Sequence, residues 1–332
     1  MKAFVVRSGP GGLTSRWEDL PDPVAPAHGV VVAVAAAALA WSDVLQMRGE
    51  YAGQLPDPPF VAGHEFAGTV VEAGAGSEFR TGERVFGFLP APAAFADYVP
   101  VADHHLRRTP ATLTDIQAAT VTTSFVTADL GLFEVGRLVP GESLLVNAAA
   151  GGVGRCAVEL AVLSGVEVIA ATAGSEARRH SVIEAGVSAV SDYAGISDMV
   201  AELTAGAGVD VALESVGGEV FDATARALAP LGRLVTIGAS SGEAPQRLKL
   251  PLLWQRSISV CGVHIGRLAL QRPEIVERSW IRLHALLDAG RLTPPVAVVL
   301  PADDIGAGID ALRSRTVDGR VVLTFGTGGE RP

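Results

Sequence analysis

Residues 143–163 read SLLVNAAAGGVGRCAVELAVL and decide the fold. An apolar strand, residues 143–147, leads into the small-residue turn AAGGVG (149–154), and an apolar helix over residues 153–164 follows directly. Glycines let the backbone turn tightly and approach a pyrophosphate, and the start of the helix offers unpaired N–H groups and a favourable dipole. A small-residue turn in an ordinary α/β sheet is the alternative, but this order of elements favours a dinucleotide-binding Rossmann fold.

The second predicted strand, residues 166–172, bears on the identity of the dinucleotide. NAD-binding Rossmann folds place an acidic residue at the end of this strand, where it bonds the ribose 2′-hydroxyl. Here that end reads ATAGS (171–175) without a carboxylate, and Arg178 and Arg179 follow in a predicted helix, residues 176–185. Ser175 and Arg178 are therefore candidates for a 2′-phosphate, and two charge-assisted bonds would favour NADPH over NADH by roughly 10²–10⁴. In the alternative reading, both arginines are solvated surface residues.

Outward from these strands, the pattern separates two parts of the chain. Strands at 209–213 and 233–237 enclose a helix at 219–229, and this alternation predicts a parallel sheet with helices on both faces. Short β segments at 30–37, 66–71, 82–87 and 95–99, separated by Gly and Pro, predict a β-rich barrel before residue 115. A helical period over 115–132, with Thr114 as N-cap, follows the barrel. A helix at 280–290 and a strand at 319–325 are expected to rejoin it.

Composition and charge limit the class of protein. Hydrophobic residues make up 48% of the 332 positions, which provides enough apolar material for two packed domains. A net charge of −10 argues against a nucleic-acid partner, because phosphate backbones favour basic patches. No segment resembles a membrane span or a signal peptide, so a soluble, cytoplasmic protein is expected. Cys156 and Cys261 stand in apolar contexts and are expected to be buried thiols.

Taken together, the motifs resemble the medium-chain dehydrogenase/reductase superfamily, specifically its zinc-independent quinone oxidoreductase and enoyl reductase branch. Besides the glycine turn, the resemblance rests on MKA (1–3), RGEY (48–51), GHEFAG (63–68), GERV (82–85), GVDV (208–211), GRLV (232–235) and GRVVL (319–323). It implies an α/β protein in which a doubly wound Rossmann sheet, residues 119–263, is inserted in a GroES-like β-barrel domain, residues 1–118 and 264–332. It also implies a homodimer that forms through the edge strand of the Rossmann domain, residues 257–263.

The resemblance further implies which residues bind NADPH and which face the substrate. The cofactor set is Asn147, Ala150, Gly151, Gly152, Val153, Gly154, Thr172, Ser175, Arg178, Tyr193, Gly238, Ala239, Ser240 and Val263. The main catalytic candidates are Tyr51, which matches a family tyrosine near the nicotinamide, and Thr127, in a segment expected to run beneath it. Secondary candidates for the cleft are Trp41, His64 and Ser124. A packed loop aromatic is the alternative role for Tyr51.

His64 raises the question of a catalytic zinc, which needs three protein ligands. Ala40 occupies the position of the family's first cysteine ligand, and residues 122–124, where a third ligand would fall, contain no Cys, His or carboxylate. No metal is expected, and His64 is expected to be a packed or cleft-lining residue, with a catalytic acid as the alternative. Ala40 also replaces an asparagine common in quinone oxidoreductases, and Asp129 replaces a frequent tyrosine, so a substrate other than simple quinones is indicated. Arg320 is expected to be a surface charge.

Without zinc, the oxidation of simple alcohols loses its usual means of stabilising an alkoxide. Hydride transfer to an already electrophilic carbon is therefore favoured. The sequence predicts an NADPH-dependent reductase of a small-molecule quinone or of the β-carbon of an α,β-unsaturated ketone. The alternatives are a non-catalytic NADPH-binding sensor or structural protein, and a zinc-free dehydrogenase or cyclase of secondary metabolism.

Overall fold

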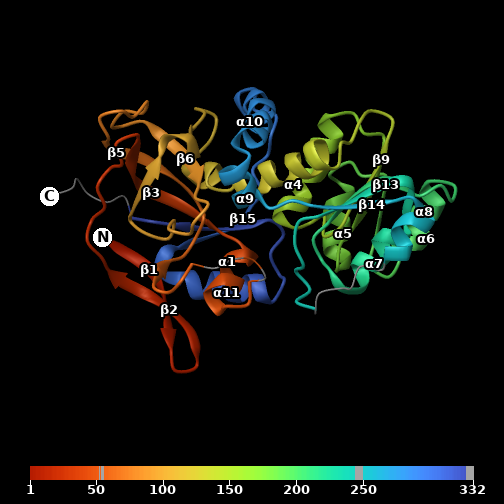
Figure 1. Cartoon of the computed structure of the whole chain (residues 1–332), viewed down its shortest axis with the longest axis horizontal. Coiled ribbons are helices and arrows are strands. Elements are labelled where there is room, and N and C mark those ends of the chain that lie inside the picture. Colours follow the sequence, from red (N-terminus) through yellow and green to blue (C-terminus); the bar gives the residue numbers. More distant parts are fainter. Residues whose placement is uncertain (52, 54–55, 244–249, 327–332) are drawn as a thin grey trace. The chain divides into compact units, whose positions relative to one another are not determined.

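The computed structural model describes residues 1–51, 53, 56–243 and 250–326 of the chain. Its contacts divide the chain into two compact units, Met1–Thr123 with Leu286–Pro332, and Ser124–Ala285 (Figure 1). Along the sequence, the second unit is therefore an insertion within the first. Each unit is built around sheets and a core of its own.

Antiparallel pairing dominates the first unit. Its larger sheet, within the described residues, has the order β15-β16-β3-β5-β6-β8, and β7 also pairs with β3. These strands are β3 Gly29–Leu39, β5 Glu65–Ala73, β6 Arg84–Phe88, β7 Tyr98–Ala102, β8 Leu106–Arg108, β15 Val296–Pro301 and β16 Arg320–Thr324. β3 is buried along most of its length, since β5, β7 and β16 pair with it. The pairing of β16 with β3 confirms that the C-terminal segment rejoins the first sheet.

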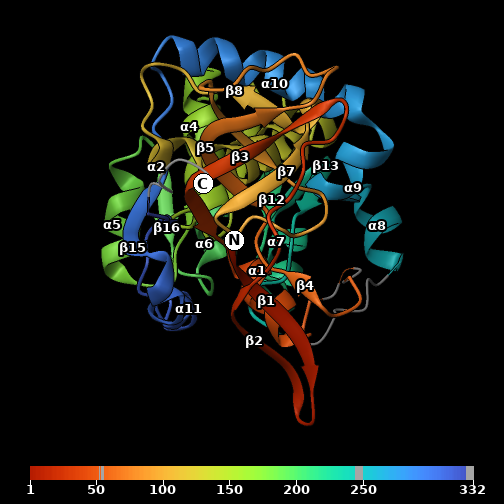
Figure 2. The ribbon, with the colours of Figure 1, turned by 90° about the vertical axis from the view of Figure 1, so that its left-hand side faces the viewer.

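A smaller sheet of the first unit has the order β2-β1-β4, with β1 Lys2–Gly9, β2 Gly12–Asp19 and β4 Phe60–Val61. β1 and β2 form a hairpin whose turn projects from this unit (Figure 2). The helical elements are α1 Trp41–Arg48, α2 Asp115–Ala118, α11 Ile305–Arg313 and the 3-10 turns η1 Asp103–His105 and η4 Ala302–Asp304. Val44 and Met47 of α1 and Ile305 of α11 join the core cluster around Phe66.

The second unit contains a parallel sheet of order β11-β10-β9-β12-β13-β14. Its strands are β9 Ser143–Val146, β10 Val168–Thr172, β11 Ala189–Ser191, β12 Val209–Glu214, β13 Leu228–Thr236 and β14 Ser259–Gly262. Numbered from β9, this order is 3-2-1-4-5-6, which confirms the predicted doubly wound Rossmann sheet. The helices are α4 Gly152–Leu163, α5 Glu176–Ile183, α6 Ile196–Leu203, α7 Gly218–Arg226, α8 Leu250–Arg256, α9 Ile265–Gln271 and α10 Pro273–Asp288.

The prediction of one continuous helix over residues 115–132 is wrong. Thr114 caps α2 as predicted, and its Oγ1 accepts a hydrogen bond from the Gln117 N–H at 3.3 Å. After α2, however, the π-helical turns η2 Thr122–Val126 and η3 Leu130–Val135 flank the short α3 Thr127–Asp129. This stretch begins with β-branched residues, which lose side-chain freedom in an α-helix. It is also buried on nearly all sides, so no single amphipathic face enforces the α-helical period.

Two smaller predictions are also corrected. The helix predicted over 219–229 ends at Arg226, because Leu228 pairs with Val209 in the sheet, and burial there outweighs helix propensity. Cys156 is buried as predicted, whereas Cys261 is only half-buried because β14 lies at the edge of the sheet.

Residues 264–285, assigned to the barrel domain from the sequence, pack with the second unit instead. Ion pairs join Arg278 and Arg282 of α10 to Glu134 and Asp129 of the same unit. None of the helices in the described ranges combines the length and the hydropathy needed to cross a lipid bilayer.

Candidate functional site

The glycine turn joins β9 to α4 in the second unit. α4 begins after Gly151, whose cap carries no side-chain hydrogen bond, so its first N–H groups have no side-chain cap. A Cβ at Gly154 would collide with the carbonyl oxygen of Ala148 and would lie 2.7 Å from Cα of Ala149. Only glycine therefore permits this close approach of the helix to the turn. The uncapped helix start fits the pyrophosphate of a dinucleotide.

Asn147 and Thr172 form a buried hydrogen-bonded brace at the ends of β9 and β10. Asn147 Nδ2 donates to Thr224 Oγ1 of α7 at 2.6 Å, and Thr172 Oγ1 donates to Asn147 Oδ1 at 2.9 Å. The structure thus brings these two predicted cofactor residues together. Their side chains connect two strands and a helix directly beneath the glycine turn.

Three of the predicted cofactor residues, Ser175, Arg178 and Tyr193, lie near the end of β10. Ser175 caps α5, and its Oγ accepts from the Arg178 N–H at 3.4 Å. A Cβ at Gly174 would lie 3.5 Å from Cε2 of Tyr193, so the tyrosine ring stands beside this turn. Ser175, Arg178 and Tyr193 are therefore neighbours, and the segment 171–175 that they adjoin contains no carboxylate.

The remaining cofactor candidates lie at the same edge of the parallel sheet. Gly238, Ala239 and Ser240 follow β13, and the Ser240 N–H donates to the Ser215 carbonyl at 2.9 Å. Val263 follows β14, and its N–H donates to Thr236 at 3.0 Å. The carboxyl ends of β9, β10, β11, β13 and β14 thus carry the predicted cofactor residues of this unit, as open α/β sheets require for ligand binding.

Sequence reasoning missed one acidic group at this edge. Glu214 ends β12 and is fully buried, and its Oε1 accepts from the N–H groups of Val216 and Gly217 at 2.6 and 2.9 Å. Burial raises the pKa of this carboxyl, and the two backbone donors oppose the shift. A carboxylate directly after an apolar strand and before two glycines was the signal available in the sequence.

Ser124 and Thr127 belong to the second unit and are both buried. Ser124 lies in the π-helical turn η2, and Thr127 begins α3. Ser124 thus lies within a π-helical turn, and Thr127 lies between two such turns. π-Helical turns are rare and occur often at functional sites.

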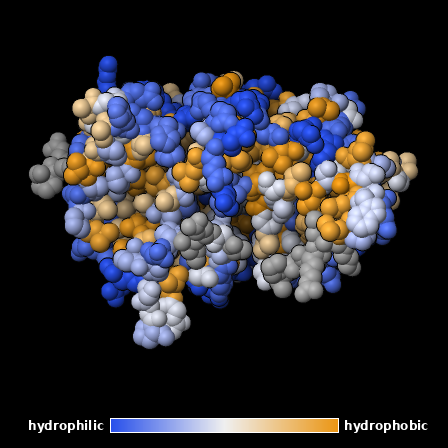
Figure 3. All heavy atoms as spheres, in the orientation of Figure 1, coloured by the Kyte–Doolittle hydropathy of each residue, from blue (hydrophilic) through white to orange (hydrophobic). Residues whose placement is uncertain are grey.

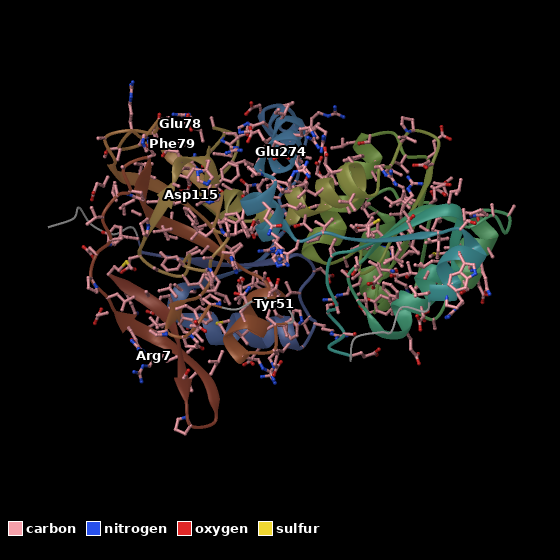
Figure 4. The ribbon with its side chains drawn as sticks, in the orientation of Figure 1. Arg7, Tyr51, Glu78, Phe79, Asp115 and Glu274 are labelled. Carbon is pink, nitrogen blue, oxygen red and sulfur yellow. The ribbon has the colours of Figure 1, made fainter. Side chains whose placement is uncertain are left out.

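The first unit contains the other candidates: Trp41, Tyr51 and His64. Tyr51 lies in the loop after α1 (Figure 4), where its ring packs against Gly53. Burial raises the pKa of the Tyr51 phenol, and the charge of Asp43 raises it further. Tyr51 is thus kept as a neutral phenol, the form that donates a hydrogen bond. Trp41 opens α1, and its buried indole Nε1 has no hydrogen-bond partner among the residues that the structure describes.

His64 is held from both sides. Its Nδ1 lies 2.6 Å from the Leu89 carbonyl oxygen, and its Nε2 lies 2.9 Å from Nε2 of Gln46. A carbonyl can only accept, so the proton of a neutral His64 is on Nδ1, and Nε2 accepts from the Gln46 amide. The ring also stacks on Phe88. Both ring nitrogens are therefore engaged with protein groups.

Glu65 and Arg320 form a buried ion pair in the first unit. Arg320 Nη2 lies 2.5 Å from Glu65 Oε2, and the Thr123 N–H donates to Glu65 Oε1. The prediction that Arg320 is a surface charge is wrong, because only 5% of this residue is exposed. Burial raises the pKa of Glu65, and Arg320 and Thr123 oppose the shift.

Asp43 is a second buried carboxyl beside this pair. Its Oδ2 accepts from the Ala40 N–H at 2.7 Å, whereas the buried Oδ1 receives no hydrogen bond from any described part of the chain. Burial raises the pKa of Asp43, and the charges of His64 and Arg320 act against this shift. Sequence reasoning used Asp43 only as a motif landmark and missed its chemistry.

We expect Asp43→Asn to change the dependence of stability on pH. A raised folded-state pKa gives stability that is complete below the ordinary carboxyl pKa and is lost as the pH rises through the folded value. The variant keeps an acceptor for the Ala40 N–H and removes this titration. Its free energy of unfolding relative to the wild type should therefore increase from pH 4 to pH 8, in urea unfolding at each pH. Since His64, Arg320 and Glu65 remain in both proteins, parallel curves would contradict the assignment.

Comparisons with known proteins agree with this geometry. Residues 26–111 match the family described as alcohol dehydrogenase GroES-like domain, and residues 152–281 match the family described as zinc-binding dehydrogenase. The chain is 32% identical over 301 residues to quinone oxidoreductase-like protein 2 homolog of Nematostella vectensis, with 89% of this chain and 81% of that protein covered. The chain belongs to the medium-chain dehydrogenase/reductase superfamily. The GroES-like domain and the quinone oxidoreductase and enoyl reductase branch are thereby confirmed.

Further relatives of this superfamily member differ greatly in length. The chain is 32% identical over 321 residues to a mycocerosic acid synthase-like polyketide synthase of Mycobacterium tuberculosis. The match covers 95% of this chain but 15% of that protein. Among solved structures, it resembles CurK enoyl reductase with a TM-score of 0.85 and 26% identity, over 98% of this chain and 99% of that chain. A mycobacterial protein complexed with NADPH gives a TM-score of 0.86 and 26% identity, over 98% and 100%.

The possible metal ligands around His64 do not fit a zinc ion. Both nitrogens of His64 and both oxygens of Glu65 are already engaged with protein groups, and Ala40 offers no donor. A catalytic zinc needs three protein ligands with free lone pairs. No step of the chemistry is therefore assigned to a metal.

Proposed function

We propose that this protein is an NADPH-dependent reductase that transfers hydride to a quinone or to the β-carbon of an α,β-unsaturated ketone, without zinc. The observation that supports this function best is the turn at Gly154, where only glycine allows α4 to approach the end of β9. The second strand of the unit, β10, also ends without a carboxylate. The kinship with quinone oxidoreductase-like and enoyl reductase proteins supports the same reaction class. An unsaturated ketone is favoured, because Ala40 and Asp129 depart from the quinone oxidoreductase pattern.

The residues at the sheet edge fit the dinucleotide. The N–H groups of 151–154 would hold the pyrophosphate. The 2′-phosphate would be bound by Ser175, Arg178 and Tyr193. The nicotinamide half would lie against residues 238–240 and Val263. When bound, NADPH supplies a hydride to the electrophilic carbon. Tyr51, held as a neutral phenol, would donate a hydrogen bond to the substrate carbonyl as negative charge develops on it. Thr127 would orient the nicotinamide, with Ser124, Trp41 and His64 lining the substrate side.

We expect Arg178→Ala to weaken NADPH binding by about 10- to 100-fold and to leave NADH binding unchanged, since it removes one charge-assisted bond to the 2′-phosphate. Dissociation constants for both nucleotides, measured by fluorescence titration, check this. Arg226→Ala is the control, because Arg226 is an exposed arginine in the last turn of α7. Equal losses for both nucleotides, or no loss, would contradict the assignment of the 2′-phosphate site.

The function is tested by mixing the purified protein with NADPH and a panel of quinones and unsaturated ketones, and following absorbance at 340 nm. Turnover with enones that falls in Tyr51→Phe supports the reductase. Tight NADPH binding without turnover across the panel would instead support a sensor or structural protein. Robust oxidation of a primary alcohol that depends on added zinc would overturn the metal argument.

We also propose a homodimer that forms through β14. This strand ends the sheet order within the described residues, so one of its edges offers unpaired backbone groups. Leu231, Leu250 and Trp254 near it are 76%, 63% and 65% exposed, and apolar side chains gather over the part of the second unit that carries α8 (Figure 3). Light scattering should give twice the chain mass of 34.2 kDa. A mass of one chain at micromolar concentration would exclude this dimer.

A further inference from the structure

The segment that carries Ser124 and Thr127 has an uncommon helical winding. η2 and η3 are π-helical, and the Gly136 N–H donates to the Gly131 carbonyl five residues earlier, at 2.9 Å. A π-helical turn holds one more residue than an α-helical turn, and the position of that extra residue sets the direction of every side chain before it. Some interaction must therefore hold the extra residue at one position along the helix.

Four charged side chains join this segment to α10, all within the second unit. Arg282 binds Asp129 with two bonds, Nε to Oδ2 at 3.0 Å and Nη2 to Oδ1 at 2.5 Å. Arg282 Nη1 also lies 2.9 Å from Glu134 Oε1, and Arg278 Nη2 lies 2.5 Å from Glu134 Oε2. We name Asp129, Glu134, Arg278 and Arg282 the α10 ion-pair network.

The spacing of the network matches a π-helix and not an α-helix. Arg278 and Arg282 are four residues apart on α10 and share one face. Asp129 and Glu134 are five residues apart, and in an α-helix such residues point about 140° away from each other. In η3, whose hydrogen bonds span five residues, they turn to the same side and meet both arginines. An α-helical winding would separate Glu134 from its two partners.

The core of the network is buried. Asp129 is 1% exposed, and the side chain of Glu134 is 13% exposed. A bidentate pair between arginine and a buried carboxylate fixes geometry strongly, and one partner left alone in the interior is costly. The outer pair of Arg278 is more exposed and is expected to matter less.

We infer that the α10 ion-pair network fixes the π-helical register of residues 122–135, and that Asp129 and Arg282 are thereby positioning residues for Thr127 and Ser124. Asp129 lies two residues after Thr127, so a shift of the extra residue along the helix rotates both hydroxyl side chains. The inference about the register stands on the ion pairs alone. The expected effect on turnover rests on the proposed reductase function.

The test uses the full chain with Asp129→Asn and Arg282→Lys, which keeps the charge but removes the planar fork. Arg272→Gln is the matched control, since Arg272 forms an exposed pair with Glu274 at the start of α10 (Figure 4). Hydrogen exchange of the amides in 122–136 should become about tenfold faster or more in both variants and stay unchanged in the control. kcat with an enone should fall about 10- to 100-fold with the KM for NADPH within a few-fold, because a displacement of about 1 Å suffices for such losses.

The two readouts separate the two proposals. Unchanged exchange in folded Arg282→Lys protein overturns the inference, whether or not the protein turns over enones. Faster exchange with unchanged kcat shows that the network only stabilises the segment, and overturns the positioning role. If the wild type reduces no substrate, the proposed function fails, and the exchange data still decide the register. Should Asp129→Asn fail to fold, Arg282→Lys carries the test.

Discussion

Replacement of Arg320 by methionine is expected to lower the free energy of unfolding by about 3–5 kcal/mol, which is the usual result of removing one partner of a buried ion pair. Glu65 is 1% exposed, and Arg320 Nη2 lies 2.5 Å from one of its oxygens. Without the guanidinium, the carboxyl must either keep an uncompensated charge in the interior or take up a proton. Urea unfolding at pH 7 measures the loss.

A second substitution tests the cause of that loss. Glu65→Gln in the Arg320→Met background removes the buried charge and keeps an acceptor for the Thr123 N–H, so it should restore a large part of the stability. Arg7→Ala is the control, because the Arg7 side chain, which pairs with Glu18 of β2, is 44% exposed (Figure 4), and a loss of no more than about 1 kcal/mol is expected. A loss below about 1 kcal/mol in Arg320→Met, or no recovery in the double variant, would contradict the buried-pair argument.

Gly154→Ala is expected to weaken NADPH binding by on the order of 10²–10⁴, the value of two lost charge-assisted hydrogen bonds. The added Cβ would collide with backbone atoms of Ala148 and Ala149. Backbone atoms, unlike the end of a flexible side chain, cannot avoid the collision by a change of rotamer. The start of α4 must then shift from β9, and its N–H groups lose their alignment toward the pyrophosphate. Fluorescence titration with NADPH measures the effect, and reductase turnover at fixed NADPH should fall with it.

Gly306→Ala is the matched control for this change. Gly306 lies in α11, and a Cβ there meets no atom within 4 Å. NADPH affinity should stay unchanged, and stability should rise by about 0.5–1 kcal/mol, since alanine is the better helix former. Wild-type affinity in Gly154→Ala would show that the turn does not hold the pyrophosphate.

Much of the second unit could be predicted because its signals are local. The apolar strand before the glycine turn, the helix after this turn and the helix that begins at residue 176 each depend on a few neighbouring residues, and the structure places them as expected. The parallel pairing of its strands was predicted from the alternation of strands and helices. The helix over 115–132 was wrong because a buried, nearly apolar segment has no polar face from which its period can be read.

The roles of the charged residues could not be predicted in the same way. Arg320 stands 255 positions from Glu65 and was taken for a surface charge, and Asp129 stands 153 positions from Arg282 and was noted only as a departure from the family. A sequence shows the identity of such residues but not their partners. Glu214 and Asp43 were missed for the same reason, since the effect of burial on a carboxyl depends on which segments cover it.

The sequence by itself determined the doubly wound sheet, the glycine turn and the kinship with the medium-chain dehydrogenase/reductase superfamily, because backbone sterics and hydrophobic periodicity act between near neighbours along the chain. Only the tertiary structure decided that His64 is held by Gln46 and Leu89, that Glu65 is paired with Arg320, and that two π-helical turns carry Ser124 and Thr127. The physical reason is that electrostatic and hydrogen-bond energies depend on distance and burial in space, and folding brings together groups that lie far apart in the sequence.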